Sequence, residues 1–266
     1  MKIAIIGTGN LGKSIAKGLI TNNAITTLYL TKRNIEGIAE FEGYKNVFLT
    51  TDNLEAVKNS DIIIFAVQPA HFENILTEIK PYITEKNVLI STITGFLIPK
   101  IEEIVGIDKF IIRAMPNTAI AVGKSMTCLC SNLQGEKRIK IAEAIFNRLG
   151  HSLSIPESQM QAATVVCASG IAFWMRLIRA TTQAAIQLGF DAKEAQELAM
   201  YTSEGAANLL IKNGNHPEEE IDRVTTPKGC TITGLNEMEH KGLSSSLIQG
   251  MVASFNKINN IKKEQI

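Results

Sequence analysis

The sequence has 266 residues, a formal net charge of +1 and four cysteines. A chain of this length holds one large domain or two smaller ones, and its near-neutral charge gives no sign of a nucleic-acid-binding surface. The cysteines form no C-x-x-C pair and have no histidines at ligand spacing, which disfavours a metal site or a disulfide framework. An apolar strand follows Lys2 directly, and no uninterrupted apolar run approaches the length of a membrane span. We therefore expect a soluble cytoplasmic protein without a metal, a nucleic-acid partner or a membrane partner.

The N-terminal segment combines a strand, a glycine-rich turn and a helix. Residues 1–6 are mostly apolar, residues 7–12 read G-T-G-N-L-G, and apolar residues then recur at helical spacing through residue 20. This order matches the G-x-G-x-x-G fingerprint of a dinucleotide-binding βαβ unit. Gly7 permits the tight turn, Gly9 lets the backbone approach a pyrophosphate, and Gly12 lets helix and strand pack closely. The N–H groups and the positive dipole end of the helix start favour phosphate binding there.

Short apolar segments alternate with amphipathic segments through the first half of the chain. We predict strands at residues 26–31, 47–50, 61–67, 88–93, 110–114 and 125–130, and helices at residues 72–79, 98–105 and 136–149. Strands separated by helices are typical of a parallel, doubly wound sheet that is covered on both faces. The expected fold class is α/β, with a Rossmann-type dinucleotide-binding domain at residues 1–155.

The second half of the sequence has only helical patterns. No convincing period-two strand pattern follows residue 156, and residues 168–188 contain just two charges, Arg176 and Arg179. A helix that is apolar on nearly all sides is buried in a core or in a subunit interface. Because a short helical domain has a small core of its own, we predict an all-α domain at residues 156–266 through which the chain forms a homodimer or a higher homo-oligomer.

The residues after the second predicted strand indicate which dinucleotide is bound. NAD-binding folds normally place Asp or Glu there, about 20 residues past the glycines, to hold the ribose 2′-hydroxyl. This chain has Lys32 and Arg33 instead, and their cations attract a 2′-phosphate. Thr31 and Asn34 add side chains that can donate hydrogen bonds, so NADP is the predicted cofactor. The alternative is that the two cations only solvate a loop, and Glu36 lies close enough along the chain to reach back.

Further motifs occur in a fixed order along the chain. They read F-A-V-Q-P at residues 65–69, I-S-T-I-T-G at 90–95, R-A-M-P-N-T at 113–118, C-A-S-G-I-A-F at 167–173 and V-T-T-P-K-G-C-T-I-T-G-L at 224–235. This set resembles the Δ1-pyrroline-5-carboxylate reductase family, from residue 2 to about residue 258. The third and fifth motifs are the specific ones, whereas many dehydrogenases share the glycine fingerprint.

The resemblance implies that NADPH reduces a cyclic C=N bond to give L-proline, in the last step of proline biosynthesis. It implies that the pyrophosphate is held by Gly7, Thr8, Gly9, Asn10, Leu11 and Gly12, and the 2′-phosphate by Thr31, Lys32 and Arg33. It also implies a cofactor cleft lined by Ala66, Val67, Gln68 and Pro69 and a nicotinamide border of Met115, Pro116 and Asn117. The substrate is expected on a loop from the partner subunit, with Thr226, Lys228, Gly229, Cys230 and Thr231 as its binding residues.

The chemistry of this loop agrees with a substrate role. Pro227 and Gly229 favour a turn, and the helix that follows offers backbone N–H groups to a small carboxylate. Thr231 is the candidate catalytic residue, placed to hydrogen-bond the ring nitrogen as a proton donor or to position the ring. The alternative, that Thr226 is an ordinary helix N-cap, does not explain the later glycine and threonines. A protonated cyclic imine is already electrophilic, so orientation carries much of the rate, and the four scattered histidines are expected at the surface.

Three positions depart from the family pattern. Gln68 replaces a lysine, Ile171 replaces a proline, and Lys228 replaces a glycine, which adopts positive φ more easily. These departures leave open a related reductase of another cyclic imine. A reductase of hydroxy or keto acids is disfavoured, because no lysine occurs between residues 159 and 192, where such enzymes carry a general acid. A non-catalytic NADP-binding sensor is the remaining alternative, although a sensor needs no second ligand pocket.

Overall fold

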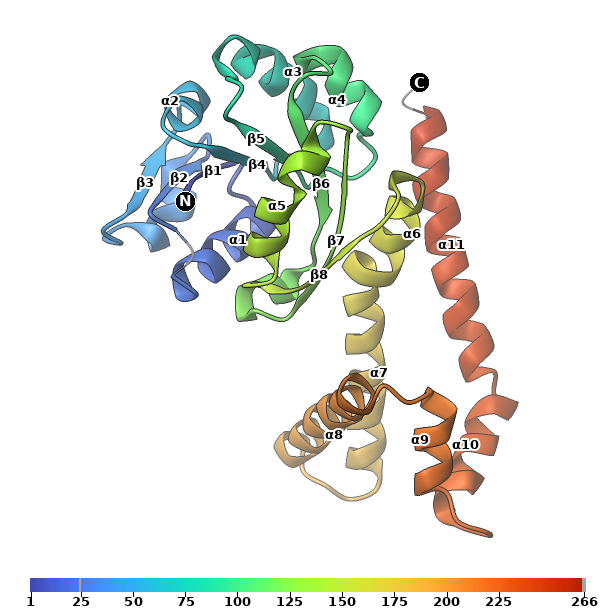
Figure 1. The fold of residues 1–266 in the computed structure, drawn as a ribbon. Coiled ribbons are helices and arrows are strands. Elements are labelled where there is room, and N and C mark those ends of the chain that lie inside the picture. The colour runs from blue at the N-terminus through green and yellow to red at the C-terminus, as the bar shows by residue number, and fades with distance from the viewer. Residues whose placement is uncertain (24, 265–266) are drawn as a thin grey trace. The chain divides into compact units, whose positions relative to one another are not determined.

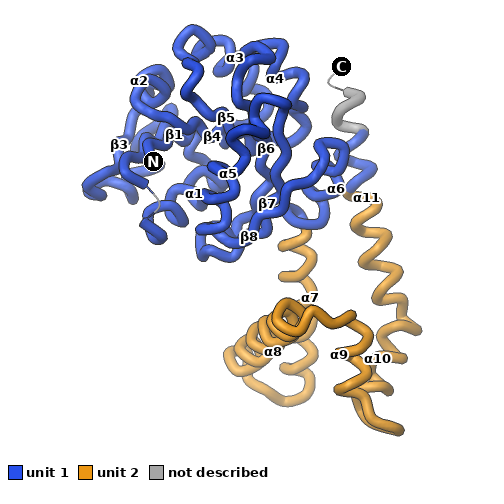
Figure 2. The backbone as a smooth tube through the Cα atoms, viewed as in Figure 1, with its two compact units in different colours: residues 1–169, 255–266 blue, residues 170–254 orange. Residues whose placement is uncertain are grey.

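The computed structural model describes residues 1–23 and 25–264, and the chain divides into two compact units. The first contains residues 1–169 and the C-terminal segment from residue 255, and the second contains residues 170–254 (Figure 2). The packing boundary falls later than residue 155, because Met160 is buried in a core cluster of the sheet and Cys167 packs against the same cluster. A functional division between residues 155 and 156 stays a prediction.

An eight-stranded sheet forms the centre of the first unit (Figure 1). Its strands are β1 (Lys2–Ile6), β2 (Thr27–Thr31), β3 (Val47–Thr50), β4 (Ile62–Phe65), β5 (Val88–Ser91), β6 (Phe110–Met115), β7 (Ser125–Ser131) and β8 (Gly150–Ser154). They lie in the order β3-β2-β1-β4-β5-β6-β7-β8. Strands β1 to β6 are mutually parallel, β7 is antiparallel to β6, and β8 is parallel to β7. The order of the first six strands is that of the Rossmann fold, with its switch point between β1 and β4, which confirms the predicted α/β class.

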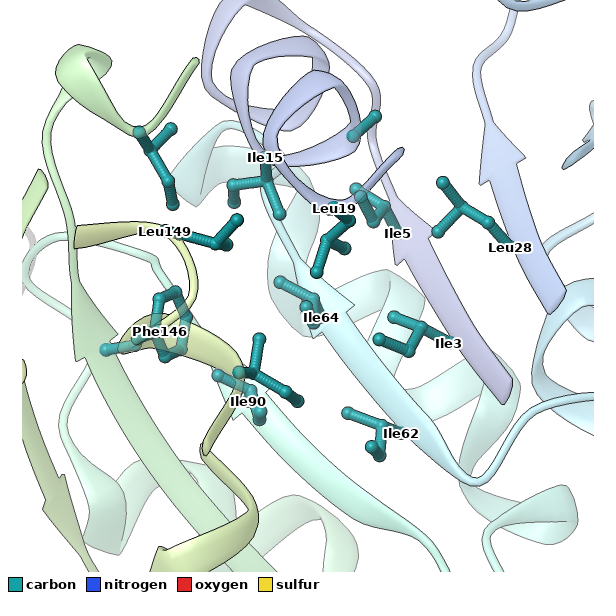
Figure 3. Packing of buried hydrophobic residues seen from close by; sticks show 14 of the residues in the cluster. Ile3, Ile5, Ile15, Leu19, Leu28, Ile62, Ile64, Ile90, Phe146 and Leu149 are labelled. Atoms are coloured by element: carbon teal, nitrogen blue, oxygen red, sulfur yellow. The ribbon is translucent and has the colours of Figure 1, made fainter. Parts of the chain in front are cut away.

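Helices cover both faces of this sheet. They are α1 (Asn10–Thr21), α2 (Asn53–Lys58), α3 (Pro69–Ile79), α4 (Ile98–Val105), α5 (Ile139–Phe146) and α6 (Met160–Ala163). Because successive strand residues point to opposite faces, Ile3 and Ile5 belong to the core cluster under α1 and α5, whereas Ala4 belongs to the cluster under α2, α3 and α4. Figure 3 shows the first cluster, where Leu19 and Phe146 meet the sheet. Burying one such side chain contributes about 1.5–3 kcal/mol, so the carboxyl ends of the strands are held in fixed positions.

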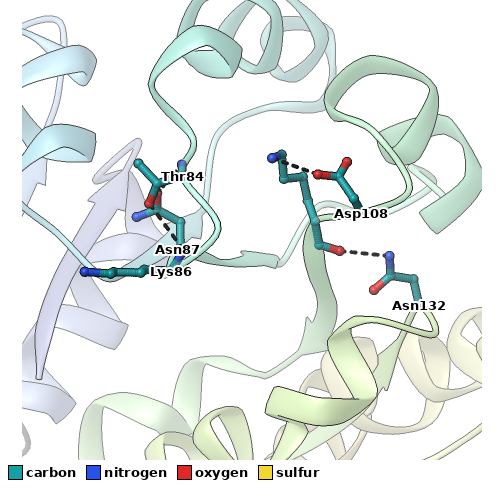
Figure 4. A network of polar contacts seen from close by, with 6 residues as sticks. Thr84, Lys86, Asn87, Asp108 and Asn132 are labelled. Carbon is teal, nitrogen blue, oxygen red and sulfur yellow. Dashed lines mark hydrogen bonds and ion pairs between the residues drawn. The ribbon is translucent and has the colours of Figure 1, made fainter.

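Short 3-10 and π turns join these elements. The 3-10 turns are Ile35–Phe41, Lys80–Tyr82, Thr118–Val122, Gly135–Arg138 and Glu157–Gln159, and the π segment is Thr164–Ser169. The Asn132 side chain fixes the turn after β7 (Figure 4). Its Oδ1 accepts hydrogen bonds from the N–H groups of Ile111 (3.1 Å) and Gly135 (2.7 Å), and its Nδ2 donates to the Lys109 carbonyl (3.0 Å).

Several boundaries differ from the sequence prediction. The unpredicted strand β8 reads G-H-S-L-S and pairs only with β7 at the edge of the sheet, where polar residues replace a continuous apolar run. The strand predicted at residues 61–67 is shorter, because the chain leaves the sheet after Phe65 toward the site described below. The helix predicted at residues 136–149 begins with a 3-10 turn, and its α-helical part is Ile139–Phe146.

The second unit is helical, which confirms the predicted all-α half. Its helices are α7 (Gly170–Gln187), α8 (Ala192–Asn213), α9 (Pro217–Val224) and α10 (Cys230–His240), and α11 (Leu243–Glu264) begins in it. Helix α7 packs against α8. Helix α8 starts where the Asp191 carboxylate accepts hydrogen bonds from the N–H groups of Lys193 (2.8 Å) and Glu194 (2.9 Å).

Much of the apolar surface of α7 is exposed in the single chain. Thr182 is one of its few buried residues, whereas Trp174 is 61 % exposed and Met175 is 57 % exposed. In the described part of the chain, the continuous helix Glu157–Gln187 is long and apolar enough, by length and composition, to cross a membrane. Arg176 and Arg179 interrupt its apolar residues, so it is not an uninterrupted apolar run. An interface helix of a soluble protein meets the same criterion, and a large exposed apolar patch is typical of an interaction surface.

Candidate functional site

A cavity of about 610 Å³ opens at the carboxyl ends of β1, β2 and β4. This is the switch point of the sheet, where open α/β folds bind their ligands. The predicted cofactor residues that line it are Gly7, Thr8, Gly9, Thr31, Lys32, Arg33, Ala66, Val67 and Gln68. Asn34, which was predicted as a hydrogen-bond donor, also lines it, and the structure adds Thr51, Asn53, His71, Asn74 and Ile75. The predicted residues that do not line this cavity are Asn10, Leu11, Gly12, Pro69, Met115, Pro116 and Asn117.

The three glycines of the turn have different reasons to be glycine. Gly7 has a φ of +90°, and a Cβ there would overlap the Val67 side chain. A Cβ at Gly12 would lie 2.7 Å from the Gly7 carbonyl oxygen, so Gly12 permits the close approach of helix and strand. A Cβ at Gly9 would meet no protein atom within 4 Å, although Gly9 lines the cavity. The fold therefore requires Gly7 and Gly12, whereas the space beside Gly9 is open to the cavity.

The Thr31 side chain ties this turn to two neighbouring elements. Its hydroxyl accepts a hydrogen bond from the Gly7 N–H (3.2 Å) and donates one to Asn53 Oδ1 (2.8 Å) at the start of α2. The Thr8 N–H donates to the Thr31 carbonyl (2.8 Å). Because the only hydroxyl proton of Thr31 is directed to Asn53, this residue positions the turn, and a hydrogen bond from it to a 2′-phosphate would require rearrangement.

The turn has the donors that a pyrophosphate requires. Helix α1 begins at Asn10 with Gly9 as its N-cap and no capping side chain, so the N–H groups of its first turn remain free for an anion. The Thr8 hydroxyl is fully buried and has no hydrogen-bond partner among the described residues. A buried hydroxyl without a partner is destabilising by about 1–3 kcal/mol, and an acceptor oxygen of a ligand removes this penalty. These residues therefore fit a dinucleotide phosphate.

The far end of the cavity is cationic. Lys32 donates a hydrogen bond from Nζ to the Gly37 carbonyl (3.2 Å), and the Arg33 side chain is exposed. Asn34 Oδ1 accepts from the Glu36 N–H (2.9 Å), which caps the following 3-10 turn. Among the described residues that line the cavity there is no Asp or Glu, and Glu36 is not one of them. A 2′-phosphate therefore meets attraction without carboxylate repulsion.

Some lining residues could not be identified from local sequence. Thr51 follows β3 and Asn53 begins α2, so their contribution depends on which strand ends meet at the switch point. His71 was expected among the surface histidines, and it lies exposed in the first turn of α3 beside the cavity. The sequence feature that could have placed His71 at the cavity was its position just after the Q-P pair of residues 68–69. In the described part of the chain, no group of three or more His, Cys, Asp or Glu side chains is arranged to hold a metal ion.

The residues predicted to border the nicotinamide lie at the end of β6. Met115 is buried, and the Asn117 side chain connects three segments. Its Oδ1 accepts from the Ala119 N–H (3.0 Å) and its Nδ2 donates to the Cys167 carbonyl (3.1 Å), while its backbone N–H donates to Ser125 Oγ (3.1 Å). Asn117 thus fixes the loop after β6, and contact of residues 115–117 with the nicotinamide stays a prediction.

A second cavity of about 620 Å³ lies beside the first turns of α3 and α4. Pro69, predicted in the cofactor cleft, lines this cavity together with Thr94, Gly95 and Phe96. Lys100 also lines it and forms only a long ion pair with Glu73 (4.0 Å). Lys100 is the one Lys or Arg among the described residues that line the second cavity, so this cavity lacks a pair of neighbouring cations such as Lys32 and Arg33.

The predicted substrate loop lies in the second unit and forms a tight turn. The Gly229 N–H donates to the Thr226 carbonyl (2.9 Å), and Lys228 has a φ of +60°. With Pro227 at the second position, this is a type II turn. The N-cap of α10 is Gly229, so Thr226 is not the N-cap of the following helix. Cys230 and Thr231 form the exposed first turn of α10, and no side chain caps it.

Lys228 occupies a backbone conformation that suits glycine. A residue with a Cβ is destabilised there by about 1 kcal/mol relative to glycine. We therefore expect Lys228→Gly to raise the free energy of unfolding by about 0.5–1 kcal/mol in urea titrations. Lys241, with a φ of −80°, is the matched control, and Lys241→Gly should lower it by about 0.5–1 kcal/mol. An equal decrease in the free energy of unfolding of both variants would contradict the inference that the backbone at Lys228 is strained.

The fold and the cavity together define the class of a dinucleotide-dependent oxidoreductase. Residues 2–95 match the family model "NADP oxidoreductase coenzyme F420-dependent", and residues 157–261 match the model "Pyrroline-5-carboxylate reductase dimerisation". Pyrroline-5-carboxylate reductase 2 of Dictyostelium discoideum is 40 % identical over 97 % of this chain and 96 % of its own length. Pyrroline-5-carboxylate reductase 1 of the same organism is 44 % identical over 96 % of this chain, which spans 49 % of that relative's length. This chain belongs to the pyrroline-5-carboxylate reductase family.

Solved structures of the family have the same fold. The pyrroline carboxylate reductase of Plasmodium falciparum, determined with NADP bound, has a TM-score of 0.88 at 26 % identity and covers 98 % of each chain. The pyrroline-5-carboxylate reductase of Coxiella burnetii has a TM-score of 0.89 at 28 % identity and covers 97 % of each chain. Both the Rossmann-type unit and the helical unit are therefore family features.

Proposed function

We propose that this protein reduces the C=N bond of Δ1-pyrroline-5-carboxylate with NADPH and produces L-proline. The observation that carries this proposal is a cavity at the switch point that is lined by a glycine turn and two cations, with no Asp or Glu among its described lining residues, in a chain of this family. The Plasmodium relative, whose structure was determined with NADP bound, supports the same cofactor.

The first unit binds and orients the cofactor. The glycine turn and the start of α1 hold the pyrophosphate, and Lys32 and Arg33 hold the 2′-phosphate. When bound, NADPH supplies the hydride. Residues 115–117 border the nicotinamide, and Asn117 keeps this border in place through its hydrogen bonds to Ala119 and Cys167.

The second unit binds the substrate. The free N–H groups at the start of α10 hold the carboxylate, and Lys228 adds a cation beside them. The Thr231 hydroxyl hydrogen-bonds the ring nitrogen, which keeps the proton on the imine and makes its carbon electrophilic. Because no stronger acid is needed for a protonated imine, orientation of this carbon toward the hydride carries much of the rate.

We propose that the assembly is a homodimer formed through the helical unit. The exposed apolar side chains of α7 need cover, and residues 157–261 match a dimerisation model. Covering α7 in this way also accounts for its apolar composition without a membrane, and we propose a soluble cytoplasmic enzyme with a small-molecule substrate.

The test is an assay of NADPH oxidation with purified protein and Δ1-pyrroline-5-carboxylate. NADH and the six-membered ring analogue are run in parallel. Turnover of the five-membered ring with NADPH supports the proposal. Turnover of only the six-membered ring would establish the alternative reductase, and intact NADPH binding without turnover of either ring would favour a sensor.

The cofactor preference depends on the two cations. We expect the double variant Lys32→Ala, Arg33→Ala to raise the KM for NADPH roughly 100-fold, since each charge-assisted contact contributes about 1.5 kcal/mol or more. The KM for NADH should stay the same, because NADH has no 2′-phosphate. Lys86→Ala, at an exposed lysine outside the cavity, is the control. Equal weakening for both cofactors would contradict the assigned role.

A further inference from the structure

Two thiols lie in contact beside the end of β6. Cys128 is in β7 and is buried, and Cys167 is in the π segment Thr164–Ser169 and is partly exposed. Their sulfur atoms are 3.9 Å apart. Cys130 is buried like Cys128, and Cys230 is exposed in the second unit. A disulfide framework was disfavoured because the four cysteines form no C-x-x-C pair, and this contact between residues 128 and 167 was not predicted.

The contact makes the two thiols chemically unequal. The two sulfur atoms lie within hydrogen-bond distance and either can donate; the contact with Cys128 lowers the pKa of Cys167 to about 7. The interaction with Cys167 and burial raise the pKa of Cys128. Burial raises the pKa of Cys130 to about 11, although Arg113 acts in the opposite direction. Cys167 is thus the more acidic of the two thiols, and the thiolate is the form that reacts with oxidants.

The local backbone can supply the movement that a bond between these sulfurs requires. The sulfur atoms must approach from 3.9 Å to the disulfide length of about 2.05 Å. Cys167 lies in a π segment, and such segments are uncommon interruptions of an α-helix that occur frequently at functional sites. A small change in this irregular turn moves the Cys167 sulfur, whereas Cys128 is fixed in the sheet.

We propose that Cys128 and Cys167 are a reversible oxidation site. Hydroperoxides oxidise these two thiols, which then form a disulfide with each other. The Cys167 thiolate attacks one oxygen of hydrogen peroxide, the O–O bond breaks, and the products are Cys167 sulfenic acid and hydroxide, which takes up a proton to become water. The Cys128 sulfur then attacks the sulfenic sulfur, the S–O bond breaks, and the second oxygen leaves as water with the Cys128 proton. The protein loses two protons and two electrons, which together are two hydrogen atoms, and one peroxide becomes two water molecules. A dithiol reductant reverses the reaction by thiol–disulfide exchange.

The oxidation site is connected to the border predicted for the nicotinamide. Cys128 is the register partner of Met115, and the Cys167 carbonyl accepts the hydrogen bond from Asn117 Nδ2 (3.1 Å). A disulfide moves the Cys167 backbone and therefore the position of Asn117. We infer that oxidation lowers the reductase rate, a consequence that rests on the proposed function, whereas disulfide formation does not depend on it.

The test uses the reduced full-length protein, treated with graded hydrogen peroxide, alkylated and digested without reduction. The expected product is a peptide pair linked between residues 128 and 167, lighter by two hydrogen atoms and lost on treatment with dithiothreitol. The rate of Cys167 alkylation should rise with pH through a midpoint near 7 in the reduced protein. Cys128→Ala should move this midpoint to higher pH, because it removes the hydrogen-bond donor to the thiolate.

Matched variants decide between this site and other oxidation. Cys130→Ala should retain the linkage, Cys167→Ala should abolish it, and Cys128→Ala should leave a sulfenic acid at Cys167 that dimedone traps. A disulfide between other cysteines, or overoxidised Cys167 without a linkage to Cys128, would overturn the proposal. Linkage with an unchanged reductase rate would overturn only the connection to Asn117, and linkage in a protein without reductase activity would leave the oxidation site intact while the proposed function fails.

Discussion

Replacing Gly9 with alanine is expected to weaken NADPH binding about 100-fold or more without unfolding the protein. Gly9 has a φ of −80°, which alanine adopts, and its new Cβ would meet no protein atom within 4 Å. The methyl group would instead project where the turn approaches a bound pyrophosphate. Loss of two charge-assisted hydrogen bonds of about 1.5 kcal/mol each gives this factor. Fluorescence titration with NADPH measures the binding, and urea unfolding measures the stability.

Gly12→Ala is the informative comparison for this variant. A Cβ at Gly12 overlaps the Gly7 carbonyl oxygen at 2.7 Å, so the helix must move away from the strand. We expect Gly12→Ala to lower the free energy of unfolding by about 1–3 kcal/mol in addition to weakening NADPH binding. Gly9→Ala should keep or slightly raise the stability, because alanine has less conformational freedom in the unfolded chain. Normal NADPH binding by Gly9→Ala would show that the phosphates are held elsewhere.

The core of the fold could be predicted from the sequence because its signals are local. Apolar runs such as residues 88–93 and the glycine turn at residues 7–12 specify strands and their exits without knowledge of distant partners. Strand β8 could not be predicted, because its stability comes from pairing with β7 and its residues are half exposed and polar. An edge strand such as β8 can therefore be recognised only when its partner strand is known.

The candidate site divides in the same way. Lys32 and Arg33 follow a predicted strand directly, so their place at the cavity was accessible from the sequence. Asn53 reaches the site through a hydrogen bond to Thr31, and this pairing depends on the order of the strands. The glycine usual at position 228 in the family that this chain resembles had pointed to a positive φ there, but only the structure shows that Lys228 itself adopts it, with a φ of +60°.

Glu157 forms an ion pair with Arg113, whose charged side chain is deeply buried. We expect Glu157→Ala to lower the free energy of unfolding by about 3–5 kcal/mol. Arg113 on β6 has a side chain that is 2 % exposed, and its Nη1 donates to Glu157 Oε1 at 2.9 Å. Arg113 Nε is buried without a partner, so the carboxylate is the main compensation for this cation. Removing one partner of a buried pair leaves an unpaired charge, which explains the expected size of the loss. The same oxygen accepts from the Ile98 N–H (2.8 Å) at the start of α4, so the helix loses its cap as well.

A double variant separates this electrostatic effect from simple loss of packing. Arg113→Met combined with Glu157→Leu removes both charges, and it should recover most of the stability that Glu157→Ala loses, because apolar pairs of similar volume replace buried ion pairs at little net penalty. Glu237→Ala is the exposed control, since its ion pair with Lys241 has both side chains mostly in solvent and should change the stability by less than about 1 kcal/mol. Urea unfolding of the four proteins measures these differences. If the double variant is as unstable as Glu157→Ala, the stability depends on the shape of the two side chains, and the compensation of a buried charge is not its cause.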